Sequence, residues 1–331
     1  MSAAPRVTVL TGGVGGSKFV VGLRDALVDA YGPSAAEHLT AIVNTGDDLW
    51  LSGVRLQPDI DSVMYALADV RDDERGWGRA GETEVVSAEL RGYGAGWPWF
   101  TLGDLDLGTH LARTGWLRDG ASVSEVVRRL VGRWAFGARL LPMTDAEVDT
   151  VVTVRDGTGE RSMHFQEWWT RHRAGLPAVR FENPGIERAA PAPEVLPAIR
   201  GADAVLLAPS NPIVSLGPVL SVPGIAGAVR ETGAPVIGVS PIIGGSPVRG
   251  MADTCLQTVG IAVSADGVAE HYGARSAGGL LDAWFIDDID EPLSARIADL
   301  GIVPEVRSIW MRDRAEAAEL ASAVLDIALS R

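Results

Sequence analysis

Short apolar runs alternate along the chain with stretches in which apolar residues recur at helical spacing. The first run, 7–10, is β-branched and ends in a glycine-rich loop, and helical spacing follows over 17–30. The next apolar run covers 39–43. Further strand-like runs cover 151–154, 204–208 and 235–239. Strands that alternate with helices in this way predict an α/β fold with a Rossmann-like, mostly parallel sheet.

One long stretch departs from this alternation. Between residues 61 and 134 the pattern is mostly helical, without a strong strand, and the loops are rich in glycine and tryptophan. We therefore predict a nucleotide-binding body made of 1–60 and 135–331, with 61–134 as a helical insertion that forms a second lobe. The helices expected in the insertion cover 61–67, 82–90, 105–117 and 123–134, and a final helix covers 314–329.

Composition narrows the classes of function. The 331 residues carry a formal net charge of −14, which disfavours sequence-independent nucleic-acid binding because that requires a basic surface. Phosphates must then be held by backbone amides, a few arginines or a metal ion. The lone cysteine, Cys255, excludes an intrachain disulfide and a thiolate zinc site. With no leader pattern and no apolar run near 18 residues in length, we expect a cytoplasmic protein without a membrane span.

The loop after the first strand combines glycines with the only lysine of the chain. Gly12, Gly13, Gly15 and Gly16 permit a tight turn and close approach of the backbone to a ligand, and the following helix presents free amides to a phosphate. The loop matches neither the Walker pattern nor G-x-G-x-x-G. Lys18 is able to reach a phosphate as a point charge. The alternatives are a structural strand–helix turn and a solvated lysine.

Acidic residues gather just after the second strand. Asp47 and Asp48 lie in one segment and Asp59 and Asp61 in the next, so four carboxylates fall within 15 residues. Clustered carboxylates at the end of a strand are suitable ligands for a hard divalent cation that bridges phosphates. The alternative is that Asp59 or Asp61 caps a helix and the other acids are solvated.

Three weaker signals lie further along the chain. Asp104 stands where the N-cap of a helix is expected, and His110 is interpreted as structural. Ser210 and Asn211 follow the most hydrophobic strand, and a Ser-Pro-Ile-Ile-Gly-Gly turn, 240–245, follows the next. Consecutive strands that end in polar turns favour one shared crevice.

Taken in order, these clusters resemble the 2-phospho-L-lactate transferase family of coenzyme F420 biosynthesis. The matching stretches are 11–16, 43–48, 58–61, 75–78, 102–104, 137–142, 164–169, 207–212 and 240–244. The glycine loop and the 164–169 stretch are most similar to the actinobacterial phosphoenolpyruvate transferase type. Lys18 stands where that type often has arginine, which keeps the charge but not the fork geometry.

The resemblance implies a Rossmann-like homodimer that depends on Mg²⁺ and transfers a substituted phosphate group. The implied donor is guanosine diphosphate linked to a three-carbon acid, either phosphoenolpyruvyl or 2-phospho-L-lactyl. The implied acceptor is the ribityl hydroxyl of 7,8-didemethyl-8-hydroxy-5-deazariboflavin. GMP leaves, and the product is dehydro-F420-0 or F420-0. The sequence leaves the donor open, because the two acids differ only in planarity at one carbon.

The resemblance also suggests roles for individual residues. Asp47 and Asp61 are expected to hold Mg²⁺, and Asp61 to position the acceptor hydroxyl as the candidate base. Phe100 is expected to cover the deazaflavin ring, and Arg139 and His164 are candidates for binding the donor's carboxylate. The residues expected to bind the donor's diphosphate and nucleotide are Gly12, Gly13, Gly15, Gly16, Lys18, Ser210 and Asn211.

Two other functions fit part of the pattern. A non-catalytic, nucleotide-binding regulator of the gluconeogenesis-factor type would keep the glycine loop and the fold. The tryptophan-rich insertion with its paired acids favours the enzyme. A nicotinamide-dependent dehydrogenase is disfavoured because the G-x-G-x-x-G fingerprint is missing.

Overall fold

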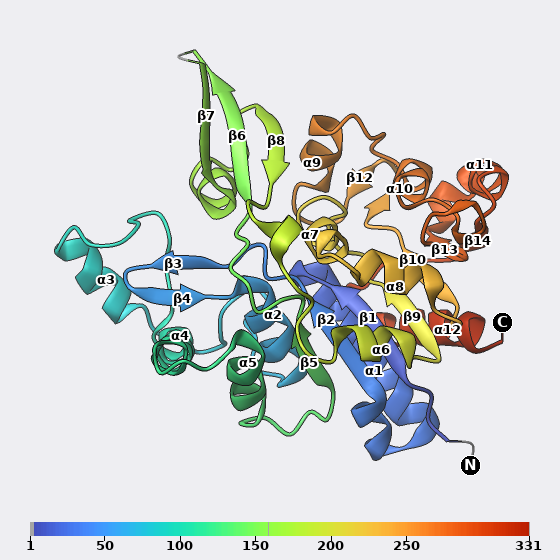
Figure 1. The fold of residues 1–331 in the computed structure, drawn as a ribbon, viewed down its shortest axis with the longest axis horizontal. Helices are drawn as coiled ribbons and strands as arrows, with labels where there is room; N and C mark the ends of the chain where they lie inside the picture. The colour runs from blue at the N-terminus through green and yellow to red at the C-terminus, as the bar shows by residue number, and fades with distance from the viewer. Residues whose placement is uncertain (1–2, 158, 331) are drawn as a thin grey trace.

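Seven parallel strands form the central sheet of the computed structural model, which describes residues 3–157 and 159–330 (Figure 1). Their order across the sheet is β14-β13-β10-β9-β1-β2-β5. The strands are β1 (Val7–Thr11), β2 (Leu39–Val43), β5 (Arg139–Pro142), β9 (Ala204–Leu207), β10 (Val236–Val239), β13 (Ala283–Ile286) and β14 (Val303–Val306). The chain builds outward from β1 to one edge and then, from β9, to the other. The predicted Rossmann-like fold is confirmed, and its topological switch point lies between β1 and β9.

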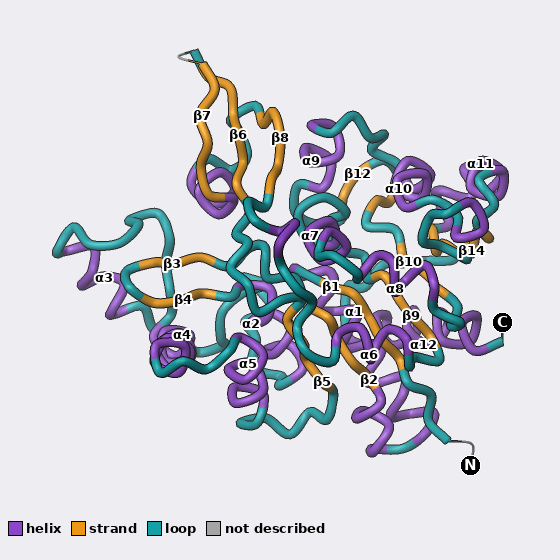
Figure 2. The backbone as a smooth tube through the Cα atoms, viewed as in Figure 1, coloured by secondary structure: helices purple, strands orange, loops and turns teal. Residues whose placement is uncertain are grey.

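Helices cover both faces of this sheet (Figure 2). Every residue of β1 is buried, as expected for a strand covered on both sides. Val7 and Val9 pack into one core, with Phe19 and Val324 among its other members, whereas Leu10 packs into the other. The first core includes residues of α1 (Gly13–Tyr31), α2 (Pro58–Leu67), α5 (Val123–Val131) and α12 (Arg314–Leu329). The second includes residues of α6 (Val195–Arg200), α7 (Leu216–Ser221), α8 (Ile225–Glu231), α9 (Ala252–Thr258), α10 (Ala265–Tyr272) and α11 (Ser294–Asp299).

The first helix begins earlier than its periodicity indicates. α1 starts at Gly13, so the glycine segment forms the first turn of the helix and not a loop that precedes it. Glycine has a low helix propensity and no apolar side chain, so the spacing of apolar residues does not show that this segment is helical. Gly13 has a positive φ of 67°, a conformation that favours glycine.

The chain leaves the central sheet after β2 and returns at β5. The excursion contains a hairpin, β3 (Leu49–Leu51) and β4 (Val54–Leu56), and the helices α2, α3 (Val85–Gly92), α4 (Asp104–Arg118) and α5. All four helices expected there are present, with ends shifted by a few residues. Ile60 of α2 and Val127 of α5 belong to the main core. The part that extends outward is therefore the hairpin with α3 and α4 (Figure 1).

The Asp104 side chain does not cap its own helix. α4 begins at Asp104 with Gly103 as its N-cap. The Asp104 carboxylate instead accepts hydrogen bonds from the backbone N–H groups of Val85 and Val86, at 3.2 and 3.1 Å, and so caps α3. A cap supplied by a distant segment cannot be read from local sequence.

A second, antiparallel sheet projects from the body (Figure 1). It consists of β6 (Val151–Asp156), β7 (Gly159–His164) and β8 (Ala178–Glu182), in the order β7-β6-β8. The predicted strand 151–154 therefore exists but does not join the central sheet. Val152 and Val154 pack against Trp168 in a core of their own. A short hairpin, β11 (Ile242–Ile243) and β12 (Ser246–Pro247), follows β10. Among the described residues, no helix combines the length and apolarity that crossing a membrane requires.

Candidate active site

Polar segments that follow β1, β2 and β9 converge at the switch point. The Ser210 hydroxyl accepts a hydrogen bond from Gly12 N at 3.1 Å and donates one to Gly12 O at 2.7 Å. Asn44 Nδ2 donates to Asp59 Oδ2 at 2.9 Å. The glycine segment, the acidic segments and the Ser-Asn turn, predicted separately, thus lie side by side. The carboxyl ends of strands at a switch point are where open α/β sheets bind ligands.

The glycines allow these segments to pack closely. A methyl group added at Gly12 would lie 2.5 Å from Asp59 Oδ2 and 2.9 Å from Ser215 Cβ, and one at Gly15 would lie 2.9 Å from the Pro209 carbonyl oxygen. One at Gly16 would overlap the hydroxyl groups of Thr11 and Ser210. Packing alone therefore requires these glycines. The first turn of α1 has no acidic side chain of its own. Its Gly13 amide donates to the Asp59 carboxylate, and the other amides of this turn are suited to an anion.

Asp47 and Asp59 form a buried pair of acids. Burial raises the pKa of Asp47 well above its ordinary value, and the neighbouring carboxyls of Asp59 and Asp48 raise it further. Burial also raises the pKa of Asp59, to about 6, although the hydrogen bond from Asn44 opposes the shift. Asp47 Oδ1 has no hydrogen-bond partner among the described residues. Buried acids so close together need protons or a cation.

Asp61 has different neighbours. It lies two residues after Asp59 on α2, so the two side chains leave the helix on different sides. Its Oδ1 contacts the guanidinium of the fully buried Arg113, and its Oδ2 lies 3.7 Å from His110 Nδ1. Burial raises the pKa of Asp61, and the charge of Arg113 opposes this shift. Among the acids, Asp59 and then Asp48 have the largest effects on the pKa of Asp47. Asp59 therefore affects the charge of Asp47 more than Asp61 does, and the Mg²⁺ pair of Asp47 and Asp61 that the family resemblance implies stays a prediction.

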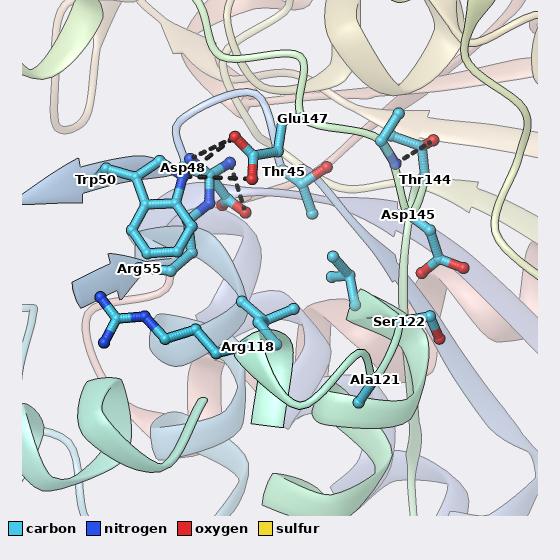
Figure 3. A pocket seen from close by; sticks show the side chains of 13 residues that line it. Thr45, Asp48, Trp50, Arg55, Arg118, Ala121, Ser122, Thr144, Asp145 and Glu147 are labelled. Carbon is cyan, nitrogen blue, oxygen red and sulfur yellow. Dashed lines mark hydrogen bonds and ion pairs between the residues drawn. The ribbon is translucent and has the colours of Figure 1, made fainter. Parts of the chain in front are cut away.

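A cavity of about 290 Å³ opens beside the acidic segment (Figure 3). Arg55, on its wall, makes a two-pronged ion pair with Asp149 at 3.0 and 2.7 Å and lies 3.7 Å from Asp48. Trp50 closes the cavity on one side and donates from Nε1 to Glu147. Arg55 and Arg113 were not among the predicted site residues, because their carboxylate partners, Asp149 and Asp61, lie far from them in the sequence.

Aromatic side chains lie between the insertion and the projecting sheet. Phe100 makes edge contacts with Trp97 and Trp99, with ring centroids 6.3 and 5.9 Å apart. The Trp97 ring lies 6.2 Å from that of His164, at the end of β7. His164 Nδ1 accepts from Gln166 N at 3.0 Å, so its Nε2 carries the hydrogen and donates to the Asp48 carbonyl oxygen at 3.1 Å. Burial lowers the pKa of His164, which favours this neutral form.

Other predicted site residues already have partners within the protein. Lys18 Nζ donates to the Met311 carbonyl oxygen at 2.9 Å, and burial, followed by the charges of Arg71 and Arg249, lowers its pKa. Asn211 Oδ1 accepts a hydrogen bond from Ile213 N at 2.9 Å and so shapes its own turn.

Arg139 does not belong to the site. It is the first residue of β5 and lies opposite Thr40, near the start of β2, whereas the acidic segment follows the end of β2. Its guanidinium pairs with Glu194 at the surface. The opposite end of the sheet is too distant for a role in binding the donor's carboxylate.

Comparison with known proteins identifies the family of this chain. The family model of CofD, described as 2-phospho-L-lactate transferase, matches residues 7–325. The chain belongs to the CofD family. A phosphoenolpyruvate transferase of Nocardia farcinica is 48% identical over 332 residues, covering 99% of this chain and 96% of the relative. The phosphoenolpyruvate transferase of Thermobifida fusca is 48% identical over 325 residues and covers 98% of both chains. The predicted family and its transferase function in coenzyme F420 biosynthesis are thus confirmed, and the regulator is not favoured.

Solved structures extend the likeness of fold. Two crystal structures of a Bacillus halodurans protein, one described as a member of the UPF0052 family, superpose on this CofD-family chain with a TM-score of 0.60. They cover 98% of this chain and 100% of their own, at 18% and 20% identity. At that level of identity the likeness concerns the fold alone.

Proposed function

We propose that this protein transfers a phosphoenolpyruvyl group from a guanosine diphosphate-linked donor to the ribityl hydroxyl of 7,8-didemethyl-8-hydroxy-5-deazariboflavin. GMP is released and dehydro-F420-0 is formed. The observation that carries the proposal is the meeting of buried carboxylates with the start of a glycine-rich helix at the switch point of a CofD-family fold. Relatives named phosphoenolpyruvate transferase, 48% identical, favour this donor over its phospholactyl counterpart.

Transfer of a substituted phosphate depends on alignment and charge neutralisation more than on covalent help from the protein. The acceptor hydroxyl attacks the phosphorus that bears the acid, a new P–O bond forms, and the bond to the GMP oxygen breaks. The first-turn amides of α1 bind the diphosphate. Asp61 Oδ2, buried and without a hydrogen-bond partner in the described structure, accepts the hydroxyl's hydrogen bond and then its proton. Phe100 and its neighbouring tryptophans cover the ring.

The residues present fit a magnesium ion. Buried carboxylate oxygens without partners, such as Asp47 Oδ1 and Asp48 Oδ1, are suitable ligands for this hard cation. Asp47 and Asp59 would hold the ion, whereas the charge of Asp61 is already balanced by Arg113. When bound, the ion neutralises charge on the donor's diphosphate and on the departing GMP.

A mass-spectrometric assay tests the proposal. Purified protein is mixed with the deazaflavin alcohol, Mg²⁺ and either guanosine donor. We expect GMP and dehydro-F420-0, formed faster than F420-0, and loss of both products in excess EDTA. Asp47→Asn should lose turnover and weaken Mg²⁺ binding by calorimetry, whereas Asp119→Asn, at an exposed acid at the end of α4, should change neither. Absence of product from both donors would refute the transferase.

The homodimer remains a proposal that rests on the family resemblance. Sedimentation of the purified protein tests it: a species of twice the 34.9 kDa chain mass supports a homodimer, and a single-chain species contradicts it.

A further inference from the structure

Helices α2 and α4 face each other across a buried network of polar side chains, and most of these side chains have no role in the proposed reaction. Asp61 and Tyr65 lie four residues apart on α2, and Asp106, His110 and Arg113 recur at helical spacing on α4. All five residues are at least 94% buried. Buried polar groups on this scale destabilise a fold unless their hydrogen bonds are satisfied.

The donor and the acceptor can be assigned for the hydrogen bonds in this network. Arginine has no acceptor, so Arg113 Nη1, which lies 2.8 Å from His110 Nδ1, must donate to it. His110 therefore carries its hydrogen on Nε2, which faces Asp106 Oδ2 at 3.3 Å. Tyr65 donates to Asp106 Oδ1 at 2.7 Å. The other prong of Arg113 contacts Asp61 Oδ1. One arrangement of protons thus links Tyr65 to Asp61.

The spacing of three of these residues also suits a metal ion. Ligand atoms of Asp61, Asp106 and His110 lie within 4.8 Å of one another. The Arg113 guanidinium, however, already contacts Asp61 and His110, and it is fully buried. A second cation there would be repelled at short range in a poorly screened interior. The guanidinium of Arg113 therefore already supplies the positive charge that a metal would bring to Asp61 and His110.

We propose that Arg113 is a positioning residue, which, braced by His110, Asp106 and Tyr65, holds the Asp61 carboxylate in one orientation with Oδ2 free for the acceptor hydroxyl. The inference rests on the proposed function, because it is the acceptor alcohol that Asp61 would meet. It separates two tasks: Asp47 and Asp59 serve the ion, and Asp61, with its internal counterion, serves the alcohol.

The same segment of chain connects this network to the aromatic cluster. Trp97, Trp99 and Phe100 directly precede α4, and Asp106 lies in its first turn. One continuous segment therefore covers the ring and orients the carboxylate that meets the far end of the same substrate. This continuity links the network to the side of the site that we propose for the acceptor.

Chemical rescue of a truncated arginine tests the proposal. Arg113→Ala should lower kcat about 100-fold, the cost of a misaligned reactive group, and leave the donor KM within about twofold. Guanidinium chloride at low millimolar concentration should restore part of kcat, because the free cation fits the vacated space. The matched control is Arg128→Ala, at an exposed arginine of α5. It should retain kcat and show no response to guanidinium.

Tyr65→Phe keeps the test decisive if Arg113→Ala does not fold. It removes one hydroxyl at the far end of the network and leaves Asp106 Oδ1 without this donor, so we expect about a tenfold lower kcat, an unchanged donor KM and a modestly lower thermal midpoint with a native fold. An unaltered kcat in Arg113→Ala, a loss that guanidinium does not reverse, or an unaltered kcat in Tyr65→Phe overturns the inference alone. A wild-type protein that forms no product overturns the proposed function, and the inference falls with it.

Discussion

Replacing Gly12 with alanine probes how tightly the site is packed. The Gly12 backbone is extended, with φ −170°, so an added methyl group causes no backbone strain. It would, however, lie 2.5 Å from Asp59 Oδ2, 2.9 Å from Ser215 Cβ and 3.1 Å from Asn44 Cβ. Asp59 is held by its hydrogen bond from Asn44 and cannot swing away freely. The strand end, the acidic segment or the α7 turn must therefore move by about 1 Å, because ordinary heavy-atom contacts lie near 3.5 Å.

Overpacking of this kind costs about 1–3 kcal/mol of unfolding free energy. A shift of about 1 Å among groups that align substrates lowers turnover about 100-fold. Urea unfolding followed by tryptophan fluorescence measures the first effect, and the mass-spectrometric assay measures the second. Gly108→Ala is the control, since Gly108 is exposed within α4 and nothing lies within 4 Å of the added methyl. Its unfolding free energy should rise by about 0.5–1 kcal/mol. Wild-type stability and turnover in Gly12→Ala would show that this packing argument is wrong.

Three further predictions follow from the site. Since the pKa of Asp59 is about 6 when folded and near 4 when unfolded, ionising it destabilises the metal-free protein as pH rises from about 4 to 6. In EDTA, the unfolding free energy of Asp59→Asn, taken relative to wild type, should therefore rise by on the order of 1–3 kcal/mol between pH 4 and pH 7.5. A difference in urea unfolding that does not change with pH would contradict the shift in the pKa of Asp59. Phe100→Ala should weaken deazaflavin binding, measured by fluorescence titration, about fivefold and leave GDP binding unchanged, since one aromatic contact contributes about 1 kcal/mol. Equal losses for both ligands would place Phe100 elsewhere. Arg139→Ala should leave turnover unchanged and alter stability by no more than about 1 kcal/mol, and a large fall in kcat would return Arg139 to the site.

The polar turns after β1, β2 and β9 could be predicted because each is a local feature: a buried strand reads as an apolar run, and polar residues directly after it must lie at the sheet edge. Parallel strands place those ends at the same edge, so convergence of Gly12, Asp47 and Ser210 followed from fold class alone. The same reasoning could not exclude Arg139, since its strand was not recognised and its position at the start of β5 depends on register.

The contacts of individual side chains could not be predicted in this way. The spacing of Asp106, His110 and Arg113 is visible in the sequence, but a helical stripe of polar residues usually faces water. Only the packing of α4 against α2 turns this stripe inward and gives Asp61 its counterion.

By itself the sequence determined the fold class, four of the seven strands in the central sheet, the first five α-helices and the last one, the family and the segments that carry the chemistry. Backbone periodicity and burial act over a few residues, so their pattern is written along the chain. The tertiary structure alone decided that Asp61 pairs with Arg113 and that Asp104 caps α3. Charge pairing and capping act over a few ångströms of space between residues far apart in sequence. Local sequence patterns therefore cannot predict them.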